Sequence, residues 1–267
     1  MHAAMPDSPS HSFVVPAFGR SPFLRDCLES LRAQTDPSPI VITSSTPHDG
    51  LHALAREFGA LIVEHSPNRG IGRDWNFALS QATTTWVTIA HQDDLYAPRF
   101  KELTLAAITA AGDDLMVFTD YEEVAEGARL HSYLPGIKRA LLEIGFLGRN
   151  RIVSRRSRTN CLRFGNAIPC PTVTLNRTLA QTRFNEHMRV NLDWEAWLDL
   201  CDVEGGFVRV RKPLVAHRIH AESETSNTLS SGHRVAEDEQ ILSRLWPRWM
   251  ARAIARTYAL AYASNAS

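Results

Sequence analysis

The stretch Trp86-Val87-Thr88-Ile89-Ala90-His91-Gln92-Asp93-Asp94-Leu95-Tyr96 changes midway from apolar to polar. Residues 86–90 are mostly apolar or β-branched, which is typical of a strand buried in a sheet. Asp93 and Asp94 follow at the carboxyl end of that strand, where open α/β sheets have their ligand crevice. Two adjacent carboxylates repel each other unless a cation neutralises them. The stretch therefore predicts either a divalent-metal site that carries a phosphorylated ligand, or a solvated turn before a helix that begins near Pro98.

Short apolar runs alternate with amphipathic segments on both sides of this stretch. The expected strands cover residues 13–15, 40–42, 61–63, 86–90 and 115–119. The expected helices begin at Ser21-Pro22, cover 51–58, end near Gln81 and begin again at Pro98. In the first helix, Leu24, Leu28 and Leu31 lie on one face because they are spaced by four and three residues. The alternation predicts a Rossmann-like, mainly parallel sheet with helices on both faces.

The pattern changes after residue 125. Residues 127–165 carry few periodic signals, and we expect a long irregular segment that either clamps phosphates or an anionic acceptor, or is a solvated basic loop. Its arginines are Arg149, Arg151, Arg155, Arg156, Arg158 and Arg163. Further strands are expected at 172–175, 207–210 and 214–216, and further helices at 193–200 and 233–262, the last broken by Pro247.

Composition and charge exclude several classes of protein. Lysine plus arginine equals aspartate plus glutamate at 29 each, which gives no argument for nucleic-acid binding. The four cysteines form no Cys-x-x-Cys pair, as expected of a reduced, cytoplasmic chain. The first eleven residues lack the apolar region of a signal peptide, and no apolar run is long enough to span a membrane. The helix at 248–262 is favoured as a core element, with docking on a membrane surface as its alternative.

Known catalytic motifs are mostly missing. Gly70-x-Gly72 is half of a dinucleotide fingerprint, but Trp75 occupies the third glycine position, so an NAD site is not expected. There is no P-loop and no Gly-x-Ser-x-Gly elbow. His217 and His220 end an expected strand, and an imidazole there can share a divalent ion with an Asp from another strand end.

Asp193 has two interpretations that are compatible. At the start of the helix 193–200 it is in a common place for a capping carboxylate. In a closed cleft the same carboxylate can act as a general base toward an acceptor hydroxyl.

Taken together, these residues resemble the family 2 inverting glycosyltransferases of the GT-A fold, over most of residues 12–225. The matching segments are Val15-Pro16-Ala17-Phe18-Gly19-Arg20 with the helix after it, Asn68 to Asn76, His91-Gln92-Asp93-Asp94, Leu192-Asp193-Trp194 and Arg218-Ile219-His220. The chain departs from the family at three places. The acidic turn after the second strand is Thr43-Ser44-Ser45-Thr46, the first Asp of Asp-x-Asp is His91, and Leu192 replaces the Glu of Glu-Asp.

The resemblance implies roles for specific residues. Asp193 is the catalytic base, and Asp93 and His220 hold Mn²⁺ or Mg²⁺. The nucleotide-sugar is bound by Pro16, Ala17, Arg20, Ser44, Asn68, Gly70, Trp75, Asn76, His91, Gln92 and Asp94. A saccharide or lipid-linked acceptor is expected, as is a UDP-sugar donor, in polysaccharide or glycolipid assembly.

The resemblance also implies a domain plan. We expect a disordered tail (1–11), a nucleotide-sugar-binding half (12–126), an elaborated acceptor-binding and catalytic half of the same α/β domain (127–232), and a helical C-terminal segment (233–267). Two other functions stay open. One is a nucleotidyltransferase that makes sugar nucleotides, and the other is a binding protein on a transferase fold that has lost its activity.

Overall fold

The computed structural model describes residues 11–125, 128–130, 133–220 and 233–264. The predicted tail lies outside this range except for His11, with which the first strand begins.

The strands are β1 (His11–Ala17), β2 (Ile40–Ser44), β3 (Leu61–Glu64), β4 (Trp86–Ile89), β5 (Leu95–Tyr96), β6 (Asp114–Ala125), β7 (Ala128–Arg129), β8 (Arg151–Ile152), β9 (Val173–Asn176) and β10 (Gly206–Arg218). The helices are α1 (Leu24–Arg32), α2 (Asp49–Glu57), α3 (Ile71–Gln81), α4 (Phe100–Ala106), α5 (Leu134–Phe146), α6 (Arg155–Leu162), the 3₁₀ turn η1 (Cys170–Thr172), α7 (Arg177–Ala180), α8 (Leu192–Leu200), α10 (His233–Leu242) and α11 (Arg248–Ser264).

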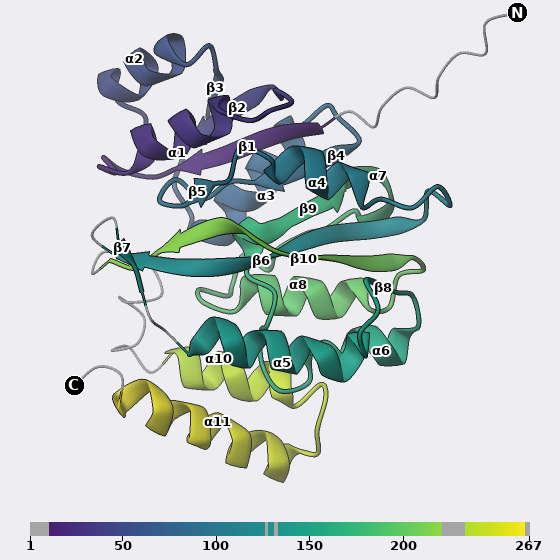
Figure 1. The fold of residues 1–267 in the computed structure, drawn as a ribbon. Coiled ribbons are helices and arrows are strands. Elements are labelled where there is room, and N and C mark those ends of the chain that lie inside the picture. The colour runs from purple at the N-terminus through teal and green to yellow at the C-terminus, as the bar shows by residue number, and fades with distance from the viewer. Residues whose placement is uncertain (1–10, 126–127, 131–132, 221–232, 265–267) are drawn as a thin grey trace, which may run out of the picture.

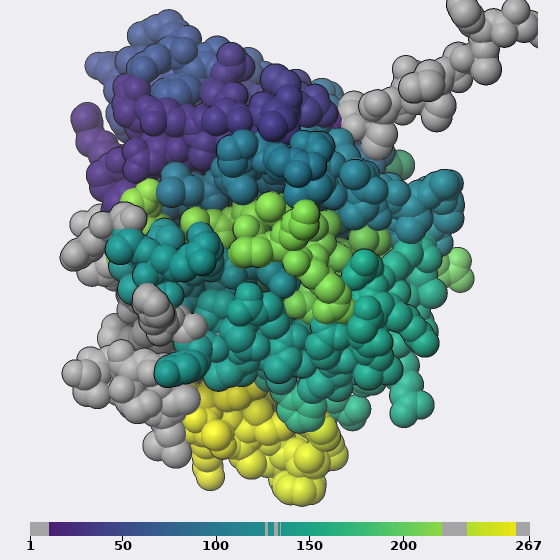
Figure 2. Space-filling view, viewed as in Figure 1, coloured from purple at the N-terminus to yellow at the C-terminus, as the bar shows by residue number. Residues whose placement is uncertain are grey.

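The strands of the described residues form one mixed sheet in the order β3-β2-β1-β4-β9-β6-β10-β5, with β7 beside β6 and β8 beside β10. The long pairings are parallel, namely β1 with β2 and β4, β2 with β3, and β6 with β10. Early and late segments of the chain pack together in one body (Figures 1 and 2). The predicted α/β fold with a mainly parallel sheet is confirmed.

Helices cover both faces of the sheet because successive residues of a strand point to opposite sides. Phe13 and Val15 of β1 pack in a core with α1, α2 and α4. Val14, between them, packs in a second core with α3, α5, α8, α10 and α11. The predicted face of the first helix is also correct, since Leu24, Leu28 and Leu31 are buried, although α1 begins at Leu24 and not at Ser21.

β9 determines the relative direction of the two strands on either side of it, β4 and β6. It is antiparallel to both β4 and β6, so these two strands run in the same direction. The carboxyl ends of β1, β2, β4, β6 and β10 therefore share one edge, at the left of Figure 1. The two strands expected at 207–210 and 214–216 are a single strand, β10, because register shifts around Pro213 keep the pairing with β6.

The segment expected to be irregular is not, and that prediction was wrong. Residues 134–146 and 155–162 form α5 and α6, and Ser154 caps α6 by accepting a hydrogen bond from the Ser157 N–H. The arginines here do not gather at the carboxyl edge. Arg151 pairs with Asp113 and Asp114 at the start of β6, at the opposite edge of the sheet (Figure 1).

Two more of these arginines are engaged away from the functional edge. Arg158 is buried and donates to the carbonyls of Leu200 and Val203. Arg155 pairs with Asp202. The expected phosphate clamp is therefore not formed by these three arginines.

The C-terminal helices are broken at Pro247 as predicted, with α10 before it and α11 after it. Ala251 and Ala255 of α11 are buried against the larger core, which supports core packing for this helix, while Trp249 is exposed. Among the described residues, none of the helices combines the length and the apolar character that crossing a bilayer requires. Docking on a membrane surface stays a prediction.

Candidate functional site

The ends of β4 and β10 meet because β5 pairs antiparallel with β10, which brings the residues just before β5 beside His217. Asp94 is completely buried there. Its Oδ1 lies 2.9 Å from Nδ1 of His217 and accepts a hydrogen bond from the backbone N–H of Arg218 at 3.0 Å. The Arg218 guanidinium donates to the carbonyl of Asp93 at 3.0 Å. The two strand ends are thus fixed to each other by charged groups.

Burial and charge have opposite effects on the pKa values of Asp94 and His217. Burial alone would raise the pKa of Asp94, but His217 and the Arg218 N–H outweigh it, and the pKa is lowered. Burial would also lower the pKa of His217, but Asp94 outweighs it and raises the pKa. Each partner therefore favours the charged form of the other.

Asp93 and His220, the predicted metal ligands, lie next to each other. Oδ2 of Asp93 is 2.9 Å from Nε2 of His220, and both side chains are partly exposed. In this arrangement His220 orients the carboxylate of Asp93.

His91, Asp93 and Asp94 form a candidate metal site, since each offers a ligand atom and these atoms lie within 4.8 Å of one another. Two buried atoms of the group have no hydrogen-bond partner, Asp94 Oδ2 and His91 Nε2. Burial lowers the pKa of His91, which keeps its imidazole neutral and able to bind a metal. A carboxylate and imidazole set suits Mn²⁺. The sequence had assigned His91 and Asp94 to the nucleotide, and here they stand beside Asp93 as candidate metal ligands.

Asp193 lies in the first turn of α8, whose capping position is Asn191 and not Asp193. Its Oδ2 accepts hydrogen bonds from the Asn166 amide at 2.6 Å and the Cys170 N–H at 3.3 Å. Its Oδ1 accepts from the Trp194 N–H at 2.9 Å. Burial raises the pKa of Asp193 although these hydrogen bonds oppose the shift. A carboxylate fixed in place with a raised pKa is suited to accept a proton.

The charges of Asp193 and Asp94 act on the same two neighbours, His91 and Cys170. The charge of each affects the pKa of His91, and each also raises the pKa of the buried Cys170 thiol, which burial raises most. Cys170 lies in η1, and its backbone N–H is one of the donors to Asp193.

Lys138 of α5 is a charged neighbour that the sequence did not identify. Its ammonium lies 5.2 Å from the centre of the Tyr121 ring. Burial lowers the pKa of Lys138, and the charge of Asp193 opposes that shift. The sequence gave no signal for this residue, because it lies in the segment expected to be irregular.

Several predicted nucleotide contacts surround the same edge. Gly70 caps α3 with φ of 104°, a conformation that favours glycine, and its N–H donates to Oδ1 of Asn68. The Gln92 amide bonds both the N–H and the carbonyl of Phe18, which fixes the loop after β1. Arg20 is exposed in that loop. Pro16 and Ala17 form the end of β1 before the loop, and Ala17 is buried.

Three other predicted contacts serve the packing. Trp75 is 7% exposed and packs against His91, with 4.9 Å between ring centres. The Asn76 side chain accepts from the N–H of Phe184 and donates to its carbonyl, both at 2.8 Å. Ser44 is buried and accepts from the Thr46 N–H.

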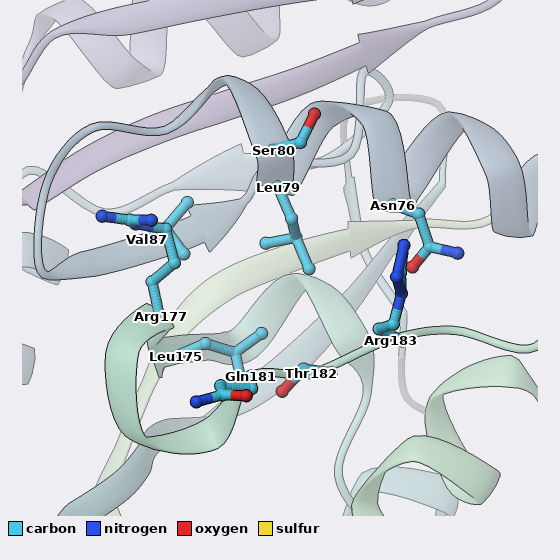
Figure 3. A pocket seen from close by; sticks show the side chains of 9 residues that line it. All are labelled: Asn76, Leu79, Ser80, Val87, Leu175, Arg177, Gln181, Thr182 and Arg183. Carbon is cyan, nitrogen blue, oxygen red and sulfur yellow. The ribbon is translucent and has the colours of Figure 1, made fainter.

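Asn76 also lines a separate pocket of about 290 Å³ (Figure 3). Its other lining residues are Leu79, Ser80, Val87, Leu175, Arg177, Gln181, Thr182 and Arg183. None of the candidate metal ligands and neither oxygen of Asp193 contributes to this lining, so the pocket is distinct from the site at the strand ends.

Carboxylates and imidazoles gather at the carboxyl ends of parallel strands, which is where α/β proteins with an open sheet bind their ligands. The chain belongs to glycosyl transferase family 2, whose sequence model matches residues 12–181. This membership confirms the resemblance seen in the sequence, and it favours a transferase of sugars over a nucleotidyltransferase.

Solved structures of low sequence identity share the fold. Residues 1–349 of TarS from S. aureus, in complex with UDP-GlcNAc, are 15% identical with a TM-score of 0.64, covering 90% of this chain and 72% of that chain. The mannosyltransferase PcManGT from Pyrobaculum calidifontis, in complex with GDP-Man and Mn²⁺, is 15% identical with a TM-score of 0.60, covering 98% and 77%. Glucosyl-3-phosphoglycerate synthase from Mycobacterium tuberculosis is 14% identical with a TM-score of 0.55, covering 89% and 80%. These likenesses confirm the GT-A type fold.

One curated relative matches a shorter region. It is a provisionally assigned glycosyltransferase, EpsH of Bacillus subtilis (strain 168), 28% identical over 120 residues. The match covers 43% of this chain and 34% of that protein, so the chain spans about a third of the length of this relative.

Proposed function

We propose that the protein transfers a sugar from a nucleotide diphosphate-sugar, preferably a UDP-sugar, to a hydroxyl group of a saccharide or lipid-linked acceptor with inversion at the anomeric carbon. Polysaccharide or glycolipid assembly is the process that such a reaction serves. Membership of glycosyl transferase family 2 supports the reaction class. The complexes of TarS with UDP-GlcNAc and of the mycobacterial synthase with UDP and Mn²⁺, which share this fold, support the donor class.

The observation that carries the proposal is the placement of Asp193. Its carboxylate is partly buried and is fixed by three hydrogen bonds, its pKa is raised, and its charge acts on His91 together with that of Asp94. Direct displacement at a sugar carbon requires a general base near the acceptor hydroxyl and positive charge at the diphosphate, which a cation on the candidate ligands would supply.

In the proposed reaction, Asp193 accepts the proton of the acceptor hydroxyl. The acceptor oxygen then forms a bond to the anomeric carbon while the bond from that carbon to the diphosphate oxygen breaks. Attack from the face opposite the leaving group inverts the configuration, and the nucleoside diphosphate departs with the electron pair of the broken bond. Lys138 provides positive charge near Asp193, which favours the ionised carboxylate before the proton arrives.

His91, Asp93 and Asp94 are the residues that would hold Mn²⁺ or Mg²⁺. A bound divalent ion supplies positive charge to the diphosphate. His220 and Arg218 keep Asp93 in place through its carboxylate and its carbonyl.

The test is the release of nucleoside diphosphate from UDP-GlcNAc, UDP-Glc and GDP-Man in the presence of Mn²⁺ and a panel of acceptors. We expect Asp193→Asn to lower the rate of release by about 10²-fold or more, while Glu195→Gln, a matched change on the same helix, retains it. The product of an active pair is examined by NMR for the inverted anomeric configuration. Binding of a nucleotide-sugar without turnover by any acceptor would favour the inactive binding protein, and absence of binding would contradict the proposal altogether.

A further inference from the structure

The backbone just before α8 is held by a carboxylate of α10. Glu237 is 9% exposed, and its Oε1 accepts a hydrogen bond from the N–H of Arg189 at 2.8 Å. Its Oε2 accepts from the N–H groups of Val190 and Asn191, both at 3.0 Å. Three successive N–H groups therefore converge on one side chain that lies 46 to 48 positions later in the sequence.

Asn191 is also held through its side chain. Its amide donates to Oδ1 of Asp238 at 2.7 Å, and Asp238 is 1% exposed. Asn191 is the capping position of α8, and its carbonyl accepts from the Glu195 N–H at 3.0 Å. Both helices lie on the same side of the sheet and pack in the larger core (Figure 1). The start of α8 is thus fixed to α10 through the backbone and the side chain of one residue.

The contact requires a carboxylate at position 237. The three partners of Glu237 are donors, and an ionised carboxylate only accepts hydrogen bonds. Its negative charge is also favoured at the N-terminal end of a helix. A glutamine would have to direct its NH₂ group at one of the two oxygen positions, so a donor would face the N–H of Arg189 or those of Val190 and Asn191. Glu237→Gln therefore breaks the contact on one side with little change in the size of the side chain.

The position of Asp193 depends on this contact because Asp193 lies two residues after Asn191. On its other side, the Asp193 carboxylate is held by the Asn166 amide at 2.6 Å and the Cys170 N–H at 3.3 Å. The second distance is close to the upper limit of a hydrogen bond, so a small movement of α8 breaks it. A displacement of about 1 Å in a reacting group can lower a rate by about a hundredfold.

We propose that Glu237 is a positioning residue, which anchors the backbone before α8 and thereby holds Asp193 in place to accept the proton of the acceptor hydroxyl. The inference rests on the proposed function and deepens it by giving the C-terminal helix α10 a part in the placement of the base. Both α8 and α10 follow the residues 12–181 that match the family model, so that match does not assign the contact.

The first test compares the kinetics of Glu237→Gln with those of the unsubstituted protein, at a temperature well below thermal unfolding. The assay is nucleoside diphosphate release with an active donor and acceptor pair and Mn²⁺. We expect kcat to fall by about tenfold to a hundredfold. The KM for the donor should not change, since α10 carries none of the residues assigned to donor binding. A kcat equal to that of the unsubstituted protein would overturn the inference.

Glu239→Gln is the matched control. Glu239 lies on the same helix and pairs with Arg252 of α11 at 2.8 Å, away from the start of α8. The same chemical change at this position should therefore leave both kcat and KM unaltered. If Glu239→Gln lowered kcat as much as Glu237→Gln, the effect would come from the charge of α10 in general and the specific role of Glu237 would be overturned.

A double variant separates positioning of the base from a general loss of structure. In the Asp193→Asn background, Glu237→Gln should lower the residual rate no further, because Glu237 acts through the carboxylate that is already absent. A loss of similar size in both backgrounds would mean that the substitution damages the protein elsewhere, and would overturn the inference.

Amide hydrogen exchange tests the anchor without any turnover. In Glu237→Gln, a peptide that spans residues 189–191 should exchange faster than in the unsubstituted protein, while the peptide of β9 keeps its rate. Unchanged exchange at 189–191 would overturn the inference. Absence of nucleoside diphosphate release by the unsubstituted protein with every donor would instead contradict the proposed function, and the exchange rates would still decide whether the anchor exists.

Discussion

Oδ2 of Asp93 lies 2.9 Å from Nε2 of His220, which joins the end of β4 to the residues just after β10 across 127 positions of sequence. The Arg218 guanidinium adds a second link to the carbonyl of the same aspartate. The position of the Asp93 carboxylate is therefore determined by β10, an element from the other half of the chain. His220 contacts Asp93 directly, so its contribution to ligand binding is expected to pass through that carboxylate.

A double-mutant cycle tests this dependence. Asp93→Asn should weaken the affinity for UDP with Mn²⁺ by tenfold or more, because a carboxylate that would hold the divalent ion, and through it the diphosphate, is lost. His220→Gln should weaken it less. The double variant should bind no more weakly than Asp93→Asn alone, since contacting residues are not additive. If calorimetry instead showed that the double variant loses affinity by the product of the two single-variant factors, His220 would contact the ligand independently of Asp93.

Asp193→Asn should lower the rate of transfer without lowering the thermal stability of the protein. The pKa of Asp193 is raised in the folded protein, so the folded state favours the protonated form. At a pH above both the folded and the unfolded pKa, the ionised carboxylate therefore costs stability, and replacing it with a neutral amide removes that cost. We expect the rate to fall by about 10²-fold or more and the midpoint of thermal unfolding to stay the same or rise. A clearly lower midpoint at pH 7.5 would contradict the assigned direction of the shift.

The pH dependence of the rate should respond to Lys138. The rate requires ionised Asp193, so it should fall as the pH decreases through the pKa of that carboxyl. The charge of Lys138 lowers the pKa of Asp193, against the larger effect of burial. Lys138→Met should therefore move the acidic limb of the pH–rate profile to higher pH. Arg155→Met is the control, because Arg155 is exposed and pairs with Asp202 away from the carboxyl edge of the sheet, and its profile should not move. An unchanged limb in Lys138→Met would exclude Lys138 from the environment of the base.

Local sequence was sufficient for the first part of the fold. β1, β2, β3 and β4 are short apolar runs separated by helices with one apolar face, and both signals depend on neighbouring residues only. The order of Asp93, Asp193 and His220 in the chain indicated the candidate base and metal ligands, and the fold places Asp93 and His220 in contact. These roles in catalysis and metal binding remain predictions.

Features that depend on distant partners could not be predicted in the same way. α6 has the polar sequence RRSRTNCL and shows no periodic apolar pattern. α5 does carry Ile137, Leu141 and Ile144 at three–four spacing, but Pro135 and two glycines in the same stretch argue against a helix. The basic segment is compensated by acidic residues 37 to 47 positions away, namely the partners of Arg151 and Arg155. Asn76 is engaged by Phe184, 108 positions later, which no local pattern indicates.

The contact between α5 and α6 gives a final prediction. A Cβ added at Gly145 of α5 would lie 2.3 Å from the backbone oxygen of Ser157 and 2.9 Å from Cβ of Cys161. The two helices must then separate, and overpacking of this kind costs about 1–3 kcal/mol. Gly145→Ala should therefore lower the urea midpoint without changing the slope of the transition.

Gly136→Ala, on the same helix, is the matched control, because its Cβ would meet nothing within 4 Å. It should be neutral or stabilise the protein by up to about 1 kcal/mol, since alanine is the better helix former. If both variants unfolded at the same urea concentration, the close contact between Gly145 of α5 and the Ser157–Cys161 turn of α6 would be contradicted.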